Sequence, residues 1–263
     1  MRRKRASRNV IALLTDFGEN DHYAGTMKGV ILSINSRATI VDISHHVSPY
    51  NVRQAGYLLW ASYRSFPDGT IFVCVVDPGV GGKRKIVGVE TDRFVFVAPD
   101  NGLLDMVRAQ EDIHQSYEIV SAPRIDARSI STTFHGRDVF APLAAALSQG
   151  KSVKQFGRLY KMNKAAPIFY ERGKENAEAR ILHIDRFGNL VTNIPAKYFD
   201  RCAVRIGKSK VTTFIRNYDE APRNTPCIIV GSSGLFEIVL REGSAAERFG
   251  VSLQEPNVLA VVG

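Results

Sequence analysis

The sequence predicts an α/β protein in which an N-terminal Rossmann-like parallel α/β domain is followed by a C-terminal all-β, barrel-like domain. In the first part of the chain, short apolar runs rich in Val, Ile and Phe alternate with amphipathic stretches, the pattern of a parallel sheet covered by helices. Beyond about residue 175 the apolar runs follow one another with Gly, Asn or Pro turns between them, as in small barrels and sandwiches. The polar segment 172–178 (RGKENAE) separates the two patterns. We therefore expect a disordered basic arm at 1–9, an α/β domain at 10–172 and a β domain at 179–263.

The elements of the N-terminal domain follow from hydrophobic periodicity. Residues 10–15, 39–43 and 70–76 are short apolar runs, which predicts buried strands. Residues 23–34 and 52–66, which lie between them, carry apolar side chains at helical spacing. Further along the chain we expect a hairpin and one more helix, at 85–91, 94–98 and 137–149.

The C-terminal domain is predicted to consist almost entirely of short strands, with one helix at 244–249. The expected strands are 179–184, 203–206, 211–215, 227–230, 236–240 and 258–262.

The composition narrows the class of protein. The chain has 263 residues, of which 44% are hydrophobic and 23% charged, so it can bury a core without a disulfide or metal. No apolar run approaches the roughly 20 residues that a membrane-spanning helix requires. Its three cysteines (Cys74, Cys202 and Cys227) are widely spaced and match neither a disulfide framework nor a zinc pattern. We expect a cytoplasmic protein that does not bind membranes.

The net charge of +9 is concentrated at the N-terminus. Five basic residues lie within the first nine positions, and subtracting them leaves +4 for the rest of the chain. Without a zinc-finger spacing or an aromatic stripe, this charge gives little support for nucleic-acid binding. We expect no nucleic-acid partner.

Carboxylates stand at or near the ends of several predicted strands, namely Asp16, Asp42, Asp77, Asp100 and Asp185. In open α/β sheets, ligands bind outside the carboxyl ends of the strands, so Asp16 and Asp77 should reach one crevice. Such a crevice suits a cation or a ribose, whose vicinal hydroxyls an aspartate accepts. The alternative for each aspartate is a helix cap or a turn.

A second polar cluster, FHGRD at 134–138, stands where a strand is expected to turn into a helix. His135 is a candidate acid–base group there, and His45 and His46 occupy another such loop. The histidines and aspartates lack the spacing of a metal site, and the glycines match no nucleotide-phosphate motif. We expect neither a metal nor a cofactor.

Six ordered motifs then give the sequence a resemblance to a known family. They are TDFG (15–18), DPGVGGKR (77–84), APDNGLL (98–104), FHGRD (134–138), IDRFGNLVTNI (184–194) and GSSGLFEI (231–238). The chain resembles the S-adenosyl-L-methionine (SAM) hydroxide adenosyltransferases, which are relatives of the fluorinase and chlorinase. The resemblance implies hydrolysis of SAM to adenosine and L-methionine by a homotrimer. In this family the site lies between the N-terminal domain of one subunit and the C-terminal domain of its neighbour.

The resemblance also implies roles for particular residues. The family's catalytic Asp-Arg-His trio falls on Asp77, Arg84 and His135, with the proton acceptor left open. Asp16 would bind the ribose hydroxyls. The other implied substrate contacts are Tyr50 and Phe187 as flanking surfaces, Asp185, Asn189 and Ser232 at the methionine and adenine ends, and Glu237 and Leu240 as weaker candidates.

Departures from the fluorinase pattern predict water as the nucleophile. The fluorinase has Tyr and Thr near the positions of Asp77 and Val80, a Tyr-Ser pair at His135-Gly136, and a long insertion, none of which this sequence has. The chlorinase lacks the insertion and has a glycine near Gly136, which leaves weak chloride chemistry open. Two further alternatives are an adenosyl-ligand sensor without turnover and a metal-dependent phosphohydrolase.

Overall fold

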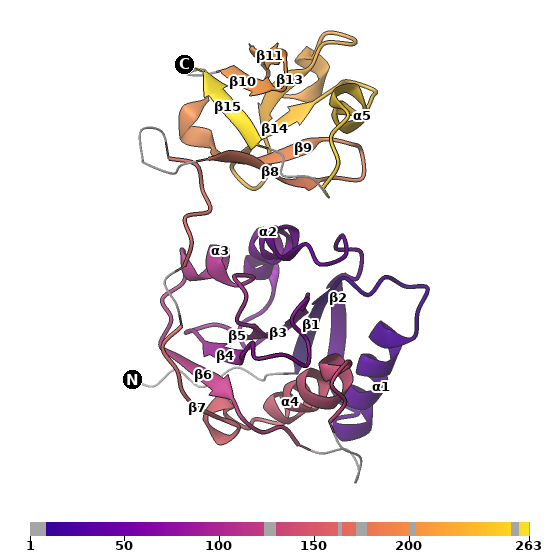
Figure 1. The fold of residues 1–263 in the computed structure, drawn as a ribbon, viewed down its shortest axis with the longest axis vertical. Helices are drawn as coiled ribbons and strands as arrows, with labels where there is room; N and C mark the ends of the chain where they lie inside the picture. Colours follow the sequence, from indigo (N-terminus) through magenta and orange to yellow (C-terminus); the bar gives the residue numbers. More distant parts are fainter. Residues whose placement is uncertain are drawn as a thin grey trace. The chain divides into compact units, whose positions relative to one another are not determined.

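The chain forms two compact units, Met1–Ala166 and Pro167–Gly263 (Figure 1). The structure, a computed structural model, describes residues 9–123, 130–162, 165–171, 178–199, 203–253 and 258–262. The predicted arm, except Asn9, and the predicted linker, except Glu178, lie outside the described residues. The expected fold class, an α/β unit followed by a β unit, is confirmed.

The N-terminal unit contains a seven-stranded sheet of order β2-β1-β3-β5-β4-β6-β7. Its strands are β1 (Val10–Thr15), β2 (Thr39–Ser44), β3 (Ile71–Val75), β4 (Ile86–Glu90), β5 (Val95–Pro99), β6 (Gln115–Ile119) and β7 (Gly157–Leu159). Strands β2, β1 and β3 pair in parallel, as predicted, and β5 also pairs in parallel with β3. The expected hairpin forms from β4 and β5, and antiparallel pairing extends the sheet through β6 and β7. The last two strands were not predicted because they contain few apolar residues.

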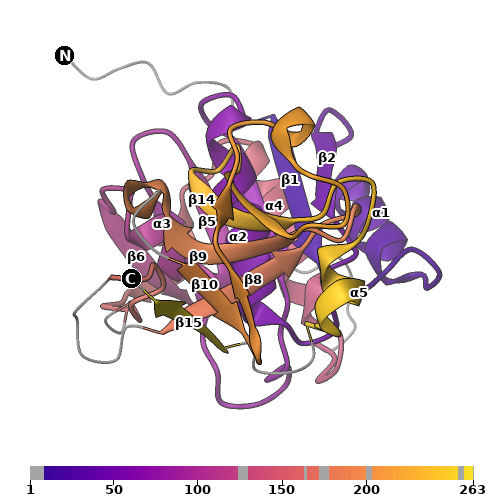
Figure 2. The same ribbon diagram turned by 90° about the horizontal axis from the view of Figure 1, so that it is seen from above.

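Helices cover both faces of this sheet. They are α1 (Tyr23–Ile34), α2 (Val52–Ser62), α3 (Asp105–Arg108) and α4 (Ala141–Ser148). Helices α1 and α4 lie side by side on one face (Figures 1 and 2), and α2 packs on the other. Successive side chains of a strand point to opposite faces, so Leu13 enters one core and Leu14 the other.

Two predicted helices begin or end differently from the expectation. The helix expected at 137–149 begins with a π-helical turn, Gly136–Phe140, before α4. The helix expected at 52–66 becomes α2 and a 3₁₀ turn, Tyr63–Ser65. Helix α1 has the predicted bounds.

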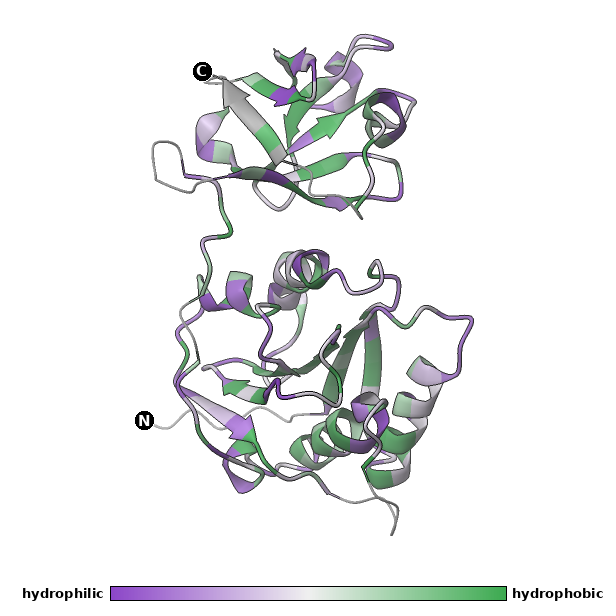
Figure 3. Cartoon of the chain, viewed as in Figure 1, coloured by the Kyte–Doolittle hydropathy of each residue, from purple (hydrophilic) through white to green (hydrophobic). Residues whose placement is uncertain are grey.

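The C-terminal unit contains an eight-stranded sheet of order β11-β10-β15-β8-β9-β14-β13-β12. Its strands are β8 (Ala179–Ile184), β9 (Leu190–Pro195), β10 (Ala203–Ile206), β11 (Ser209–Val211), β12 (Thr213–Phe214), β13 (Cys227–Val230), β14 (Leu235–Val239) and β15 (Val258–Val262). Helix α5 (Ala245–Phe249) follows its N-cap Ser244, whose hydroxyl accepts the Glu247 amide at 3.1 Å. Apolar residues lie mainly on the strands and on the helix faces that meet them (Figure 3).

One predicted strand of this unit, 211–215, is wrong. The chain turns between β11, which pairs with β10, and β12, which pairs in parallel with β13. Val211, Phe214 and Ile215 give the segment the composition of a strand, and a change of pairing partner within it does not alter that pattern. Strand β9 was not predicted, although both of its faces are buried. Its polar Asn193 is satisfied there by carbonyl oxygens of Ile168 and Glu178, at 2.7 and 2.9 Å.

Within the described part of the chain, no helix has the length and apolar character needed to cross a bilayer.

Candidate active site

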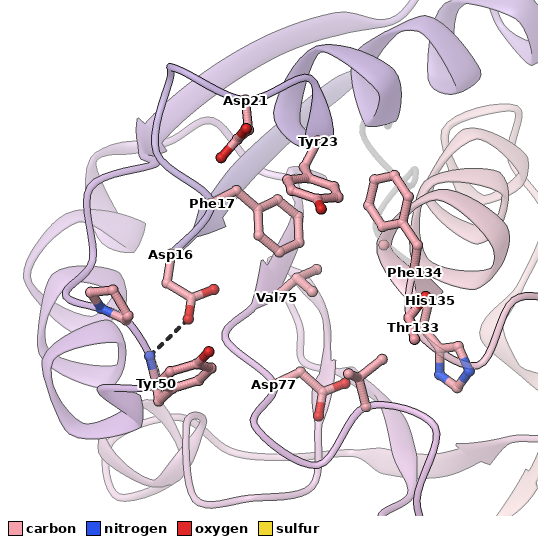
Figure 4. A pocket seen from close by; sticks show the side chains of 13 residues that line it. Asp16, Phe17, Asp21, Tyr23, Tyr50, Val75, Asp77, Thr133, Phe134 and His135 are labelled. Carbon is pink, nitrogen blue, oxygen red and sulfur yellow. Dashed lines mark hydrogen bonds between the residues drawn. The ribbon is translucent and has the colours of Figure 1, made fainter.

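A cavity of about 410 Å³ opens at the carboxyl ends of β1 and β3 in the N-terminal unit (Figure 4). Asp16 follows β1, and Asp77 comes two residues after β3. Because these strands are parallel neighbours, both carboxylates reach this cavity, as expected. The other lining residues are Phe17, Asp21, Tyr23, Pro49, Tyr50, Val75, Val80, Thr133, Phe134, His135 and Gly136.

Arg84 forms a bidentate ion pair with Asp77. Its Nε lies 3.0 and 2.9 Å from the two carboxylate oxygens, and its Nη2 lies 2.5 Å from Oδ2. Both side chains are largely buried, with 4% of Asp77 and 12% of Arg84 exposed. A paired guanidinium of this kind holds a carboxylate in a fixed orientation. Asp77 therefore cannot rotate without breaking three hydrogen bonds.

Arg84 also fixes the protonation pattern of His135. Its Nη2 lies 2.6 Å from His135 Nδ1. A guanidinium has no acceptor, so Nδ1 accepts this hydrogen bond and the neutral ring carries its proton on Nε2. Burial and the charge of Arg84 both lower the pKa of His135 below its ordinary value, against the opposing effects of Asp77 and Asp138. The imidazole is thus held neutral, with Nε2–H as a donor.

The His135 loop is held from both sides. Asp138 accepts a hydrogen bond from the Ser131 amide at 2.8 Å and pairs with Arg137 at 2.7 Å. Gly136 packs closely, because a Cβ there would lie 3.0 Å from Met27 Sδ. These contacts lock the turn that presents the imidazole to the cavity.

On the β1 side of the cavity, Asp16 accepts a hydrogen bond from the Tyr50 amide at 2.9 Å. Its other carboxylate oxygen points toward the cavity (Figure 4). Burial and the nearby charge of Asp77 raise the pKa of Asp16, although the amide contact opposes the rise. Tyr50 has a left-handed backbone (φ 65°), and 72% of the residue is exposed at the rim. The Asp16 oxygen is thus available to a hydroxyl-bearing ligand.

An aromatic corner of Phe17, Tyr23 and Phe134 completes the cavity wall, and the sequence analysis gave these residues no role. Their ring centroids lie 5.0 to 6.0 Å apart. The available signal was adjacency, since Phe17 follows Asp16 and Phe134 precedes His135. Asp21 was also missed, because it belongs to no motif.

The remaining predicted site residues lie in the C-terminal unit. Asp185 accepts the amides of Phe187 and Asn189 through Oδ1 and the Asn189 side chain through Oδ2, each at 2.9 Å. These bonds shape a tight turn that leaves 77% of Phe187 exposed. Asp185 and Asn189 therefore have a structural task in addition to any contact with a ligand.

Glu237 lies beside the GSSG turn of the same unit. A Cβ on Gly231 would lie 1.8 Å from Glu237 Oε1, so a larger residue there would displace the Glu237 carboxylate. Burial, with the charge of Asp185, raises the pKa of Glu237. Ser232 is exposed in this turn, whereas Leu240 packs against the core of the unit. The structure thus gathers the predicted residues into two sets, one in each unit.

Among the described residues, no group of three or more His, Cys, Asp or Glu side chains is placed to hold a metal ion.

Comparison with known proteins gives one family for both units. Residues 11–157 match the SAM hydroxide adenosyltransferase N-terminal domain, and residues 179–257 match the corresponding C-terminal domain. A protein of Methanocaldococcus jannaschii named (R)-S-adenosyl-L-methionine hydrolase is 35% identical over 88% of each chain. A protein of Thermus thermophilus with the same name is 32% identical, covering 92% of this chain and 95% of its own.

Fluorinases and solved structures are also similar. A fluorinase of Nocardia brasiliensis is 27% identical over 78% of each chain. An uncharacterized conserved protein of Thermotoga maritima superposes with a TM-score of 0.84 at 33% identity, covering 96% of this chain and all of its own. Taken with the two matched domains, these relatives show that the chain belongs to the SAM hydroxide adenosyltransferase family.

Proposed function

We propose that this protein hydrolyses S-adenosyl-L-methionine to adenosine and L-methionine by attack of water at the ribose C5′. The observation that carries the proposal is the Asp77–Arg84–His135 cluster beside a cavity that also holds the Asp16 carboxylate. The names of the two hydrolase relatives support this reaction and favour the (R) sulfonium epimer as substrate.

In this reaction the attacking water needs activation, whereas the leaving group does not. The sulfonium departs as a neutral thioether, so no general acid is required. Water is a weak nucleophile that gains most from orientation opposite the C5′–S bond. Because positive charge is neutralised as the bond breaks, a site that excludes bulk water favours the step.

The geometry gives each residue of the Asp77–Arg84–His135 trio a different role. Arg84 occupies His135 Nδ1, so the neutral ring offers Nε2–H to the oxygen of the attacking water and has no free lone pair for a proton. Asp77 retains lone pairs beyond those that Arg84 uses. Attack converts water into a protonated alcohol, a far stronger acid than a carboxylic acid. A carboxylate is therefore basic enough, and we assign the proton to Asp77.

The other proposed site residues bind the substrate. Asp16 accepts the ribose hydroxyls, with Tyr50 beside them. Asp185, Asn189 and Ser232 hold the methionine and adenine ends, with Phe187 as a flanking surface and Glu237 and Leu240 nearby. The proposed assembly is a homotrimer in which neighbouring copies supply the two sets of residues. The proposed compartment is the cytoplasm, and the free, buried thiols of Cys74 and Cys227 suit a reducing environment.

One incubation tests the reaction. Purified protein is mixed with (R)-SAM in EDTA, with and without chloride, and the products are separated by chromatography. Equimolar adenosine and methionine, unaffected by chloride, are expected. A 5′-chloro product would indicate halide chemistry, and activity restored only by added metal would indicate a metal-dependent hydrolase. Unchanged SAM together with tight binding by calorimetry would indicate a sensor.

A further inference from the structure

His45 is a buried histidine close to the cavity that has no part in the proposed reaction. Its side chain is 2% exposed, and it is not among the residues that line the cavity. Its Nδ1 lies 2.8 Å from the Thr15 hydroxyl, and its Nε2 lies 3.0 Å from Asp42 Oδ1. Thr15 is completely buried at the end of β1, directly before Asp16.

Polar side chains contact the His45 ring at both nitrogens. Lys28 Nζ lies 2.5 Å from Asp42 Oδ2, and this contact helps to hold the pKa of Asp42 below its usual value although burial opposes it. His45 Nε2 lies within ion-pair distance of Asp42 Oδ1, at 3.0 Å, but it is buried and makes no hydrogen bond to a described residue. Nδ1 shares a hydrogen bond with the Thr15 hydroxyl, whose oxygen also accepts the Phe17 amide at 3.3 Å.

Backbone contacts join the same two segments. The His45 carbonyl accepts the Gly18 amide at 2.7 Å, and the Thr15 carbonyl accepts the Val47 amide at 3.4 Å. Residues 15–18 are therefore tied to residues 45–47 by side chain and backbone together. Asp16 lies inside the first segment, and the second leads to Tyr50, whose amide Asp16 accepts.

We propose that His45 is a positioning residue that acts through Thr15 to hold Asp16 and Tyr50 in the arrangement that receives the ribose. The inference rests on the proposed function for the identity of the ligand. Its physical basis is that a buried hydrogen-bonded network rigidifies the groups that it connects, and an ordered Asp16 carboxylate loses less freedom when a ligand binds. The network touches the ribose side of the cavity and not the Asp77–Arg84–His135 side.

The test compares Thr15→Val, which keeps the shape and removes the hydroxyl, with Thr15→Ser, which restores it. KM and kcat are measured for SAM, Kd for adenosine by calorimetry, and Tm for each variant. Thr15→Val should raise KM and the adenosine Kd roughly 5–30-fold, the range that one or two kcal/mol produces, with kcat nearly unchanged. Thr15→Ser should return both constants toward those of the wild type. The matched control is His46→Gln, because His46 is 65% exposed and pairs with Glu19 at 3.3 Å on the surface.

Unchanged KM and adenosine Kd in Thr15→Val would overturn the inference, as would a fall in kcat at unchanged KM. If Thr15→Val does not fold, His45→Gln replaces it, since glutamine is a polar residue of similar size that lacks the ring nitrogen in contact with Thr15. The same two outcomes then overturn the inference. A wild type that leaves SAM intact contradicts the proposed function instead, and adenosine binding then tests His45 without turnover.

Discussion

Arg84 connects the two other members of the proposed trio, and this single side chain decides what each can do. It holds both oxygens of Asp77 and occupies Nδ1 of His135. A guanidinium is a donor and never an acceptor, so Arg84 donates in both contacts. The arrangement makes Asp77 the acceptor and His135 the donor of the proposed reaction.

Replacing Asp77 tests the acceptor role. Asp77→Asn should lower kcat roughly 10²–10⁴-fold, the usual scale for a lost acid–base group, because an amide cannot take the proton. Turnover is measured as adenosine release. Asp100→Asn is the matched control, since Asp100 also follows a strand but accepts a hydrogen bond from Tyr160 at 2.8 Å outside the cavity. Equal turnover in Asp77→Asn and the wild type would remove Asp77 from the chemistry.

The pH profile tests the state of His135. Its pKa is lowered by burial and Arg84, so the ring stays neutral to a lower pH than a free histidine, whose pKa is roughly 6.5. Because the neutral ring is the proposed form, activity should hold as pH falls through that value and decline only below it. The variant His135→Gln, which keeps a donor near Nε2, should retain more turnover than His135→Ala. Because glutamine does not titrate, its pH–activity profile should lack the decline at low pH that protonation of His135 causes. A decline that begins above pH 6.5 would contradict this assignment.

The DPGVGGKR turn, residues 77–84, is the element that brings Asp77 and Arg84 together. Gly81 has φ +75°, and a Cβ there would lie 2.1 Å from the Thr132 carbonyl oxygen. The turn therefore packs directly on the segment that leads to His135. Only glycine satisfies both the backbone conformation and the close approach.

Gly81→Ala should accordingly lower the free energy of unfolding by more than backbone strain alone would. A non-glycine residue in the left-handed region costs about 1–3 kcal/mol, and the clash with a backbone carbonyl adds to it. Urea unfolding measures the loss, and adenosine release should fall with it. Gly150→Ala is the control, because Gly150 has φ +89° and no atom within 4 Å of a Cβ. A Gly81→Ala variant no less stable than Gly150→Ala would refute the packing argument.

Apolar periodicity predicted the bounds of a strand or helix correctly where that element packs against the same neighbouring elements along its whole length. Helix α1 and strand β8 have the predicted bounds because their apolar side chains face one core along their length. The segment 211–215 fails that condition, since it changes partner between β11 and β12. The π-helical turn before α4 was likewise beyond reach, because its apolar spacing resembles that of an ordinary helix.

The two units each carry one set of proposed substrate residues, and this division makes the homotrimer testable. If neighbouring copies share each site, Asp77→Asn and Asn189→Ala should both be inactive alone and partly active when mixed and reassembled. In mixed trimers some sites combine an intact N-terminal unit with an intact C-terminal unit. Adenosine release is measured before and after mixing. No gain in activity, although sizing and mass analysis show mixed assemblies, would contradict a shared site.

The sequence by itself determined the fold class, the family resemblance and the aspartates at the strand ends. These depend on local periodicity and on short motifs, which a single chain displays directly. The resemblance placed Arg84 and His135 in one trio, but only the tertiary structure showed that Arg84 Nη2 contacts His135 Nδ1 across 51 positions of the chain. It alone also decided that Phe17, Tyr23 and Phe134 form one wall and that His45 contacts Thr15. Such contacts depend on how loops reverse the chain between strands. Their geometry comes from packing across the sheet, which residue order does not encode locally.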